Sequence, residues 1–233
     1  MNLCTIATEG VWLDLHAARW LRYVRENVPD AVTHLIVAGK DTRLFHPHHP
    51  VAGGFDKVRA YGLDVADRPW FNEVRMGACE LFGVDEMVYV DADADVLDDL
   101  SGLHALMGDK RLGWVRSPIL FGEWANLGDP LGLGRVEWVA NNCLLVMRGD
   151  FTKEYVAARE ELSKYDSNPR VRGTYAFNLM LHRNPGCWVE LPGEYGVCWW
   201  DCAGWESAKV IQYVNDKGKA KRERLEKLRR AMA

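Results

Sequence analysis

The sequence predicts a single α/β domain with a mostly parallel β-sheet flanked by helices. The chain has 233 residues, 48% of them hydrophobic, which is enough to bury one sizeable core and falls within the range of one domain. It begins with a strand, a helix and a second strand, an order that places the two strands parallel. A later buried strand, Met87–Val90, ends abruptly in three aspartates, and parallel sheets bind ligands beyond the carboxyl ends of their strands.

The strand–helix–strand unit lies at the start of the chain. Asn2–Thr8 alternates weakly between apolar and polar residues and ends before a glycine, which is typical of a strand that enters a loop. Leu13–Val28 then carries its apolar residues on one helical face and is closed by Pro29. Thr33–Ala38 is an apolar run of strand length. These segments predict the first βαβ unit of the sheet.

The rest of the chain continues to alternate between helix and strand patterns. Helices are predicted at Phe71–Leu81, at Leu100–Leu106 behind a cap at Asp98 or Asp99, at Phe151–Tyr165 and at Gly173–His182. Strands are predicted at Leu112–Val115, Arg135–Met147 and Trp188–Leu191. Loops are predicted at Gly39–Phe55, with His46, His48 and His49 in a solvated turn, and at the glycine-rich Phe121–Gly134, which we interpret as a lid or an acceptor loop. We expect residues 1–215 to form the domain and residues 216–233 to form a basic C-terminal helix.

The composition argues against several classes of protein. A net charge of −4 provides no global attraction to nucleic acid or to an anionic membrane, so any such contact must be local. No apolar run reaches the roughly 18–20 residues that span a bilayer, and the N-terminus lacks the basic-then-apolar pattern of a signal peptide. We therefore expect a cytosolic protein whose six cysteines are reduced. A zinc site at Cys198 and Cys202 is disfavoured because the spacing fits no standard zinc knuckle.

The aspartates that follow Met87–Val90 are Asp91, Asp93 and Asp95. Alternate residues of a strand share a face about 7 Å apart, and two carboxylates at that distance repel by roughly 2–3 kcal/mol at an effective dielectric of about 20. A divalent cation converts this repulsion into binding. The cluster therefore predicts a site for a cation or for open water at the carboxyl end of the strand.

Four interpretations of the aspartate cluster compete. An EF-hand requires glycine sixth and glutamate twelfth from Asp91, but Val96 and Gly102 stand there, so this interpretation is excluded. A phosphatase of the haloacid-dehalogenase type also places D-x-D after an apolar strand, although its nucleophile strand normally comes first in the fold. A third interpretation is a solvated turn that caps the next helix. The fourth, which we favour, is a D-x-D metal site that holds a nucleotide diphosphate.

Three further polar residues need an explanation. Arg75 lies on the border of an apolar helical face, so its guanidinium either reaches outward to water or meets an anion. Asn141 and Asn142 interrupt an apolar strand, where two amides need hydrogen-bond partners. These amides either satisfy the backbone at a bend or point toward a ligand hydroxyl.

Nearly the whole chain resembles the GT-A glycosyltransferases, and in particular the family that contains glycogenin and the bacterial lipopolysaccharide galactosyltransferases. The most specific match is YVDADADVLDDLSGL, Tyr89–Leu103, which is similar to the family's strand, D-x-D motif and following helix. The segment IATEGVW resembles the family's first strand and loop, WVANNCLLVM its sugar-lining strand, and LPGEY and VIQYVNDKGK its closing motifs. The resemblance implies a single-domain GT-A, Rossmann-like fold and transfer of a sugar from a nucleotide sugar.

The resemblance also assigns roles to individual residues. Asp91 and Asp93 would be the ligands of the metal and the diphosphate, with Gln212 in the place of the third metal ligand, and Ala92 would contact the nucleotide sugar. The resemblance places the other nucleotide-sugar contacts at Ala7, Thr8, Trp12, Arg75, Lys217 and Lys219, with Thr8 and Trp12 around the uracil and a lysine on the leaving diphosphate. Asn141 and Asn142 would contact hydroxyls of the sugar or the acceptor.

Two segments depart from the family pattern. Gln212 stands where the family has a histidine, and a neutral amide oxygen should bind Mn²⁺ or Mg²⁺ less tightly. GTYAFN, Gly173–Asn178, stands where the family has D-Q-D-A-L-N, so the acidic residues that contact the sugar near the reacting carbon are missing.

We therefore expect a metal-dependent glycosyltransferase that moves a hexose-type sugar from a UDP-sugar to an unknown acceptor: a glycan, a lipid-linked molecule, a protein or a nucleic acid. Retention of anomeric configuration, as in the family, needs no enzymic base, whereas inversion does, with Asp201, Glu194 and Glu123 as candidates. From Lys217 to Arg230 the chain carries eight basic residues, which predicts a weak contact with an anionic acceptor or a peripheral membrane contact. The alternatives are the phosphatase and a catalytically inactive nucleotide-sugar-binding protein.

Overall fold

The structure, a computed structural model, describes residues 1–8, 12–39, 49–62, 69–118, 122–165, 169–198 and 207–212. Several sequence predictions fall outside these residues. They are the turn with His46 and His48, the candidate base Asp201, Cys202, the two lysines Lys217 and Lys219, and the basic C-terminal helix at 216–233.

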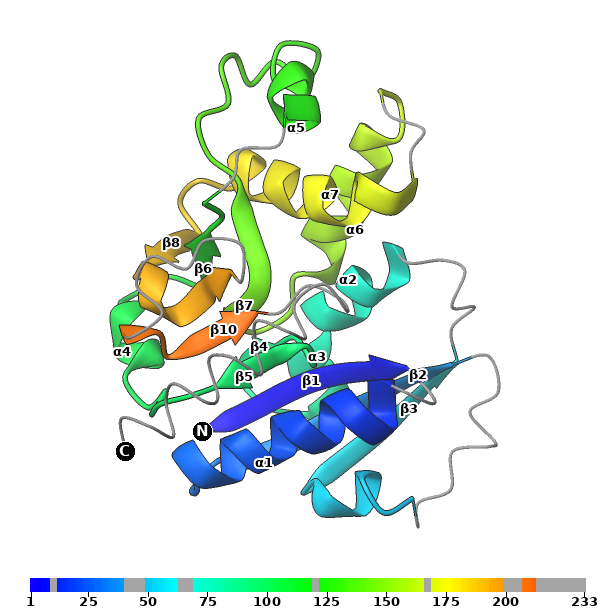
Figure 1. Cartoon of the computed structure of the whole chain (residues 1–233). Coiled ribbons are helices and arrows are strands. Elements are labelled where there is room, and N and C mark those ends of the chain that lie inside the picture. Colours follow the sequence, from blue (N-terminus) through cyan, green and yellow to red (C-terminus); the bar gives the residue numbers. More distant parts are fainter. Residues whose placement is uncertain are drawn as a thin grey trace.

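A seven-stranded sheet forms the centre of the fold (Figure 1). Its order is β3 (Lys57–Gly62), β2 (Val32–Gly39), β1 (Asn2–Thr8), β4 (Glu86–Val90), β7 (Ala140–Arg148), β6 (Leu112–Arg116) and β8 (Trp188–Leu191). Among these strands β7 alone runs antiparallel to both of its neighbours, and every other pairing is parallel. The prediction of an α/β fold with a mixed, mostly parallel sheet is confirmed.

Helices cover both faces of this sheet because its inner strands carry apolar residues on both sides. Leu3 and Ala7 of β1 belong to one hydrophobic cluster, and Cys4 and Ile6 to the other. The first cluster is covered by η1 (Trp12–Ala17), α1 (Ala18–Asn27), η3 (Ala52–Gly54) and α4 (Leu103–Leu106). The second cluster is covered by α2 (Pro69–Met76), α3 (Ala78–Phe82), α5 (Gly122–Leu127), α6 (Thr152–Leu162) and α7 (Pro169–Arg183). This double burial explains why the strands are continuous apolar runs.

A second, three-stranded sheet joins the end of the described chain to the aspartate segment. Its order is β5 (Ala94–Val96), β10 (Val210–Gln212) and β9 (Val197–Cys198), with η4 (Gly193–Gly196) just before β9. Gln212 pairs with Ala94 across the antiparallel β5–β10 ladder. The sequence does not predict this sheet, because strands of two and three residues are too short to show a period.

The predicted helix Phe71–Leu81 is divided at Gly77 into α2 and α3. A Cβ atom at Gly77 would lie 2.9 Å from Oγ1 of Thr152 and 3.2 Å from Oδ2 of Asp150. The backbone at Gly77 thus lies close to the start of α6. This contact is between segments that are distant in sequence, so the apolar pattern of residues 71–81 does not predict the division.

The prediction for the segment after the aspartates was partly wrong. Leu100 and Leu103 are fully buried as expected, but Leu106 is 44% exposed because α4 has only four residues. Neither predicted cap contacts this helix: Asp98 accepts the N–H of Asp99, and Asp99 accepts that of Ser101. These aspartates close a turn that precedes the helix.

Three other elements differ from the sequence predictions. The edge strand β3 was missed although Lys57–Ala60 alternates between charged and apolar residues; most of this strand is exposed. The predicted loop Phe121–Gly134 contains α5, whose Trp124 is fully buried and lies 5.4 Å from the ring of Tyr175. The predicted strand Arg135–Met147 begins only at Ala140. Apart from the C-terminal helix, which lies outside the described residues, the remaining predicted helices and strands are present. The strands β1 and β8 have the predicted bounds, and the other elements have shifted ends.

Four cysteines among the described residues, Cys4, Cys79, Cys143 and Cys187, are free thiols. None of the helices in the described parts of the chain combines the length and the apolar character that a membrane crossing requires.

His34 is a buried polar group in the middle of β2. It is fully buried, its Nε2 lies 3.1 Å from Oδ1 of Asn2, and its ring packs edge-on against Phe82 at 4.6 Å. Burial, assisted by the nearby Lys57, lowers the pKa of His34 from 6.5 to about 4. The folded protein therefore keeps this imidazole neutral at pH values where the unfolded chain protonates it.

We predict that His34 makes the protein less stable as the pH falls from about 6.5 to about 4, because the unfolded state then binds the extra proton. Between pH 7 and pH 5, the wild type should lose about 2 kcal/mol more unfolding free energy than His34→Gln. Urea titrations at the two pH values measure this difference. Equal losses in the two proteins would show that His34 does not carry this linkage.

Candidate functional site

The candidate site begins where β4 ends. The N–H of Asp91 donates to the carbonyl of Cys143 in the neighbouring β7 at 2.8 Å, and the N–H of Ala94 donates to the carbonyl of Asp91 at 3.0 Å. The second bond closes a tight turn that leads directly from β4 into β5. Because β1 and β4 are parallel neighbours, the carboxyl end of β1 lies at the same edge of the sheet.

Asp91 accepts hydrogen bonds on both carboxylate oxygens. Its Oδ1 lies 2.7 Å from the Tyr89 hydroxyl and 3.1 Å from Nη2 of Arg75, while its Oδ2 accepts Nε2 of Gln212 at 3.0 Å. Its side chain is still 17% exposed. Burial raises the pKa of Asp91, and the charge of Arg75 and the bond from Tyr89 oppose that rise.

Arg75 is held from three sides. Besides its ion pair with Asp91, Nη1 donates to the carbonyl of Asn142 at 2.6 Å, and the guanidinium lies 4.3 Å from the centre of the Tyr89 ring. The side chain is 8% exposed, and its Nε has no hydrogen-bond partner among the described residues. The sequence left open whether Arg75 reaches water or an anion, and in this structure its anion is Asp91.

The three aspartates of the cluster do not share one environment. Asp95 is 1% exposed and forms an ion pair with Nε of Arg19 on α1 at 2.8 Å. Asp93 is 8% exposed and lies in the turn between β4 and β5. Asp95 therefore ties α1 to β5, whereas Asp91 lies with Arg75 and Gln212.

Asn141 and Asn142 lie at an irregularity of β7. The β6–β7 register shifts there, since Trp114 pairs with Leu145 but the next residue, Val115, pairs with Asn141. Oδ1 of Asn141 accepts the N–H of Cys143 at 3.1 Å, which satisfies backbone at the bend. Nδ2 of Asn142 instead donates to Oδ1 of Asn72 on α2 at 3.1 Å. Both asparagines are half-buried.

Sequence reasoning missed Asn178, which holds the start of β7. It is fully buried in α7, its Oδ1 accepts the N–H of Ala140 at 2.7 Å, and its Nδ2 donates to the carbonyl of Thr174 at 2.9 Å. Its position on the apolar face of a helix was a usable signal, because a buried amide needs partners. Tyr89 and Asn72 were missed for another reason: their partners are remote in sequence.

The other candidate residues lie in several different elements of the fold. Ala7 is buried near the end of β1, and Ala92 is buried in the turn after Asp91. Thr8 ends β1 and Trp12 begins η1, but their side chains lie outside the described part of the structure, as does that of Glu123. Glu194 lies in η4, where its carbonyl accepts the N–H of Lys209 at 2.8 Å.

The donor groups near Asp91 fit Mn²⁺ or Mg²⁺ in chemical type, because these ions prefer carboxylate and carbonyl oxygens. A rotation of the Gln212 amide would present Oε1 where Nε2 now lies. Among the described residues no group of three or more histidines, cysteines, aspartates or glutamates is placed to hold a metal ion. Among the described residues, the amide of Gln212 is the candidate for a third protein ligand beside Asp91 and Asp93.

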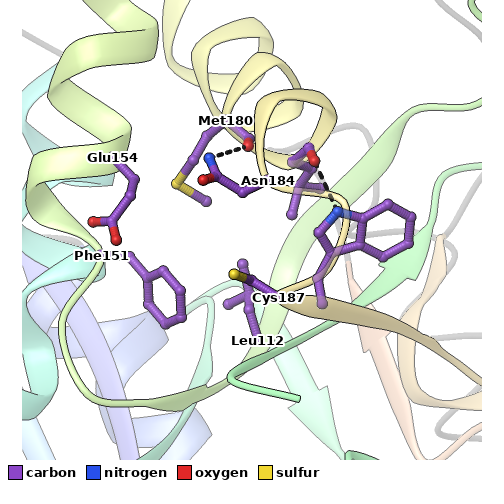
Figure 2. Close-up of a pocket in the computed structure, with 8 residues that line it drawn as sticks. Leu112, Phe151, Glu154, Met180, Asn184 and Cys187 are labelled. Carbon is purple, nitrogen blue, oxygen red and sulfur yellow. Dashed lines mark hydrogen bonds between the residues drawn. The ribbon is translucent and has the colours of Figure 1, made fainter.

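A separate hollow lies at the opposite end of the sheet, where β6 and β8 begin (Figure 2). Apolar side chains from these strands and α7, together with Phe151 just before α6, form most of its wall, and α6 itself contributes the carboxylate of Glu154. Two polar groups of its wall bond within the chain, since Asn184 donates to the Met180 carbonyl and Trp188 to the Leu181 carbonyl, each at 2.8 Å. The hollow therefore offers a ligand few polar contacts, and the Asp91 region is the better candidate.

Solved glycosyltransferase structures are similar to this chain. The galactosyltransferase LgtC in complex with donor and acceptor sugar analogues matches with a TM-score of 0.63 and 15% identity, over 93% of this chain and 88% of LgtC. An active-site mutant of LgtC matches with a TM-score of 0.65 and 15% identity, over 92% and 88%. The glycosyltransferase GlyE of Streptococcus pneumoniae matches with a TM-score of 0.56 and 12% identity, over 92% of this chain and 55% of GlyE.

No protein-family model and no curated protein matches the sequence. The structural likeness establishes a GT-A-like glycosyltransferase fold, as the resemblance of the sequence implied.

We predict that Arg75→Lys lowers the free energy of unfolding by roughly 2–3 kcal/mol. A lysine keeps the charge but cannot contact the Asn142 carbonyl and Asp91 together while lying on the Tyr89 ring. Urea titration measures the loss. The matched control is Arg116→Lys, whose ion pair with Glu190 is exposed and should contribute less than about 1 kcal/mol. Equal losses in the two variants would contradict the importance of the buried arrangement.

Proposed function

We propose that this chain, which has a GT-A-like glycosyltransferase fold, is a metal-dependent glycosyltransferase that uses a UDP-sugar as donor. The observation that carries the proposal is the position of Asp91 and Asp93 at the carboxyl end of β4, where β10 brings Gln212 to Asp91. Ligands of open α/β sheets bind at such an edge. The donor and acceptor sugar analogues bound to the similar LgtC support a sugar-transfer site on this fold.

Asp91, Asp93 and Gln212 would hold the metal, with Mn²⁺ or Mg²⁺ as the matching ions. When bound, such an ion supplies Lewis-acid stabilisation of the departing diphosphate. The chain's own contribution is orientation: Tyr89 and Arg75 hold Oδ1 of Asp91, so the carboxylate cannot rotate freely. Lys217 or Lys219 would add positive charge to the leaving diphosphate.

We further propose that Ala7, Thr8 and Trp12 hold the uracil at the carboxyl end of β1, next to β4. Asn141 and Asn142 would face the transferred hexose-type sugar, and Ala92 the diphosphate. With retention of configuration, the leaving oxygen takes the acceptor proton and no base is required. Asp201 is the proposed base if the reaction inverts.

A dehalogenase-type phosphatase is not favoured, since the similar solved structures are glycosyltransferases. The basic segment Lys217 to Arg230 makes an anionic acceptor, or an anionic membrane with a lipid-linked acceptor, the first class to test.

The metal site is tested with Asp93→Asn, which keeps the shape of the side chain and removes its charge. Release of UDP from UDP-sugars in the presence of Mn²⁺ should fall by orders of magnitude, while circular dichroism shows an intact fold. The matched control is Asp109→Asn, because Asp109 is an exposed carboxylate on the surface turn after α4. Near-normal turnover by Asp93→Asn would refute the metal site, and binding without turnover in the wild type would indicate an inactive binding protein.

The uracil site is tested with Trp12→Ala. If the indole stacks on the base, calorimetry with UDP should show binding weakened by about 1–3 kcal/mol. Trp188→Ala is the control, because Trp188 lies at the opposite end of the sheet beside the apolar hollow. An unchanged dissociation constant in Trp12→Ala would show that this indole does not contact the nucleotide.

A further inference from the structure

Four residues form a polar cluster between α2, β7, α6 and α7. Nδ2 of Asn142 donates to Oδ1 of Asn72 at 3.1 Å, and the amide of Asn72 lies beside Gly173 and the Tyr155 hydroxyl. That hydroxyl donates in turn to the carbonyl of Gly173 at 3.4 Å. The cluster therefore holds the amide of Asn72 in one orientation.

Gly173 is a glycine because Asn72 occupies the space of its missing side chain. A Cβ atom at position 173 would lie 2.1 Å from Nδ2 of Asn72. The backbone does not explain the glycine, since residue 173 is inside α7 and is not among the positive-φ glycines of the described chain. Glycine inside a helix costs about 1 kcal/mol relative to alanine, so the contact with Asn72 is the physical reason for it.

The cluster is continuous with the Asp91 site. The carbonyl of Asn142 accepts Nη1 of Arg75 at 2.6 Å, and Nη2 of the same guanidinium pairs with Asp91. Asn72 and Asn142 are both half-buried, so part of each side chain remains open to a ligand.

An asparagine amide can donate two hydrogen bonds and accept two. Within the described part of the chain, Asn72 uses one lone pair of its oxygen toward Asn142, which leaves its amide able both to donate and to accept a further hydrogen bond. A sugar hydroxyl both donates and accepts, so it matches that remaining capacity. A carboxylate ligand would use only the N–H.

We propose that Asn72 is a specificity-determining residue that hydrogen-bonds a hydroxyl of the donor sugar, and that Gly173 is required to leave room for its amide. The inference rests on the proposed function, because it takes the diphosphate to lie at Asp91. A site built to bond a hydroxyl rejects an analogue that lacks it, since the amide is then left unpaired. A substitution of Asn72 should therefore weaken the binding of the sugar part of the donor and leave the binding of the nucleotide part unchanged.

The first test compares dissociation constants for UDP, UDP-glucose, UDP-galactose and UDP-N-acetylglucosamine, measured by calorimetry with Mn²⁺. In the wild type, at least one UDP-sugar should bind more tightly than UDP. Asn72→Ala should weaken that UDP-sugar roughly three- to tenfold and leave UDP unchanged. The control is Asn184→Ala, a half-buried asparagine at the opposite end of the sheet, which should change neither constant.

The second test uses Gly173→Ala, which keeps Asn72 but pushes its amide aside. The far end of a flexible side chain yields easily, so the variant should fold and still lose the same UDP-sugar affinity. In the double variant Asn72→Ala with Gly173→Ala, the two losses should not add, because both remove one interaction. Gly186→Ala controls for the substitution itself, since a Cβ atom there meets nothing within 4 Å.

The outcomes separate the two levels of the proposal. Failure of the wild type to bind both UDP and the UDP-sugars would refute the proposed function, and the inference with it. If the wild type binds but Asn72→Ala weakens UDP and the UDP-sugar equally, or neither, the role of Asn72 is wrong while the proposed function stands. Additive losses in the double variant would overturn the coupling between Asn72 and Gly173.

Discussion

The structure of the site depends on the buried ion pair between Arg75 and Asp91. The guanidinium contacts the Asn142 carbonyl, the Tyr89 ring and the Asp91 carboxylate, so one side chain of α2 joins the ends of β4 and β7. Gln212 adds β10 from the other side of the carboxylate. Removing one partner of a pair shielded from water leaves an uncompensated charge, which costs far more than an exposed ion pair provides.

This ion pair also changes the electrostatic interpretation of the aspartate cluster. From the sequence alone, three neighbouring carboxylates require a cation or open water to offset their repulsion. In the structure an arginine already lies beside two of them, Arg75 at Asp91 and Arg19 at Asp95. A metal ion at this site would therefore meet less negative charge than three aspartates imply. The amide of Gln212 carries no charge, so as a ligand it would also bind a metal ion less tightly than a charged side chain.

The parts of the fold that the sequence predicted well are those with long apolar patterns. The strands β1, β2, β4 and β6 and the helices α6 and α7 were all found, because burial on two faces or along one stripe is encoded locally. Elements without such a pattern were missed or divided differently. The edge strand β3 is exposed, β5 and β10 have three residues each, and the break at Gly77 comes from contact with α6.

The sequence by itself determined that a buried strand ends in carboxylates at the ligand-binding edge of an α/β sheet, because both features lie within a dozen consecutive residues. Only the tertiary structure decided which side chains meet there. Asp91 bonds to Gln212, which is 121 positions away, and the missing side chain of Gly173 leaves the space that Asn72 fills. The spacing of apolar residues along a segment indicates which of its faces is buried. Contacts between distant segments depend on how the helices and strands pack together, and no single segment of the sequence determines that.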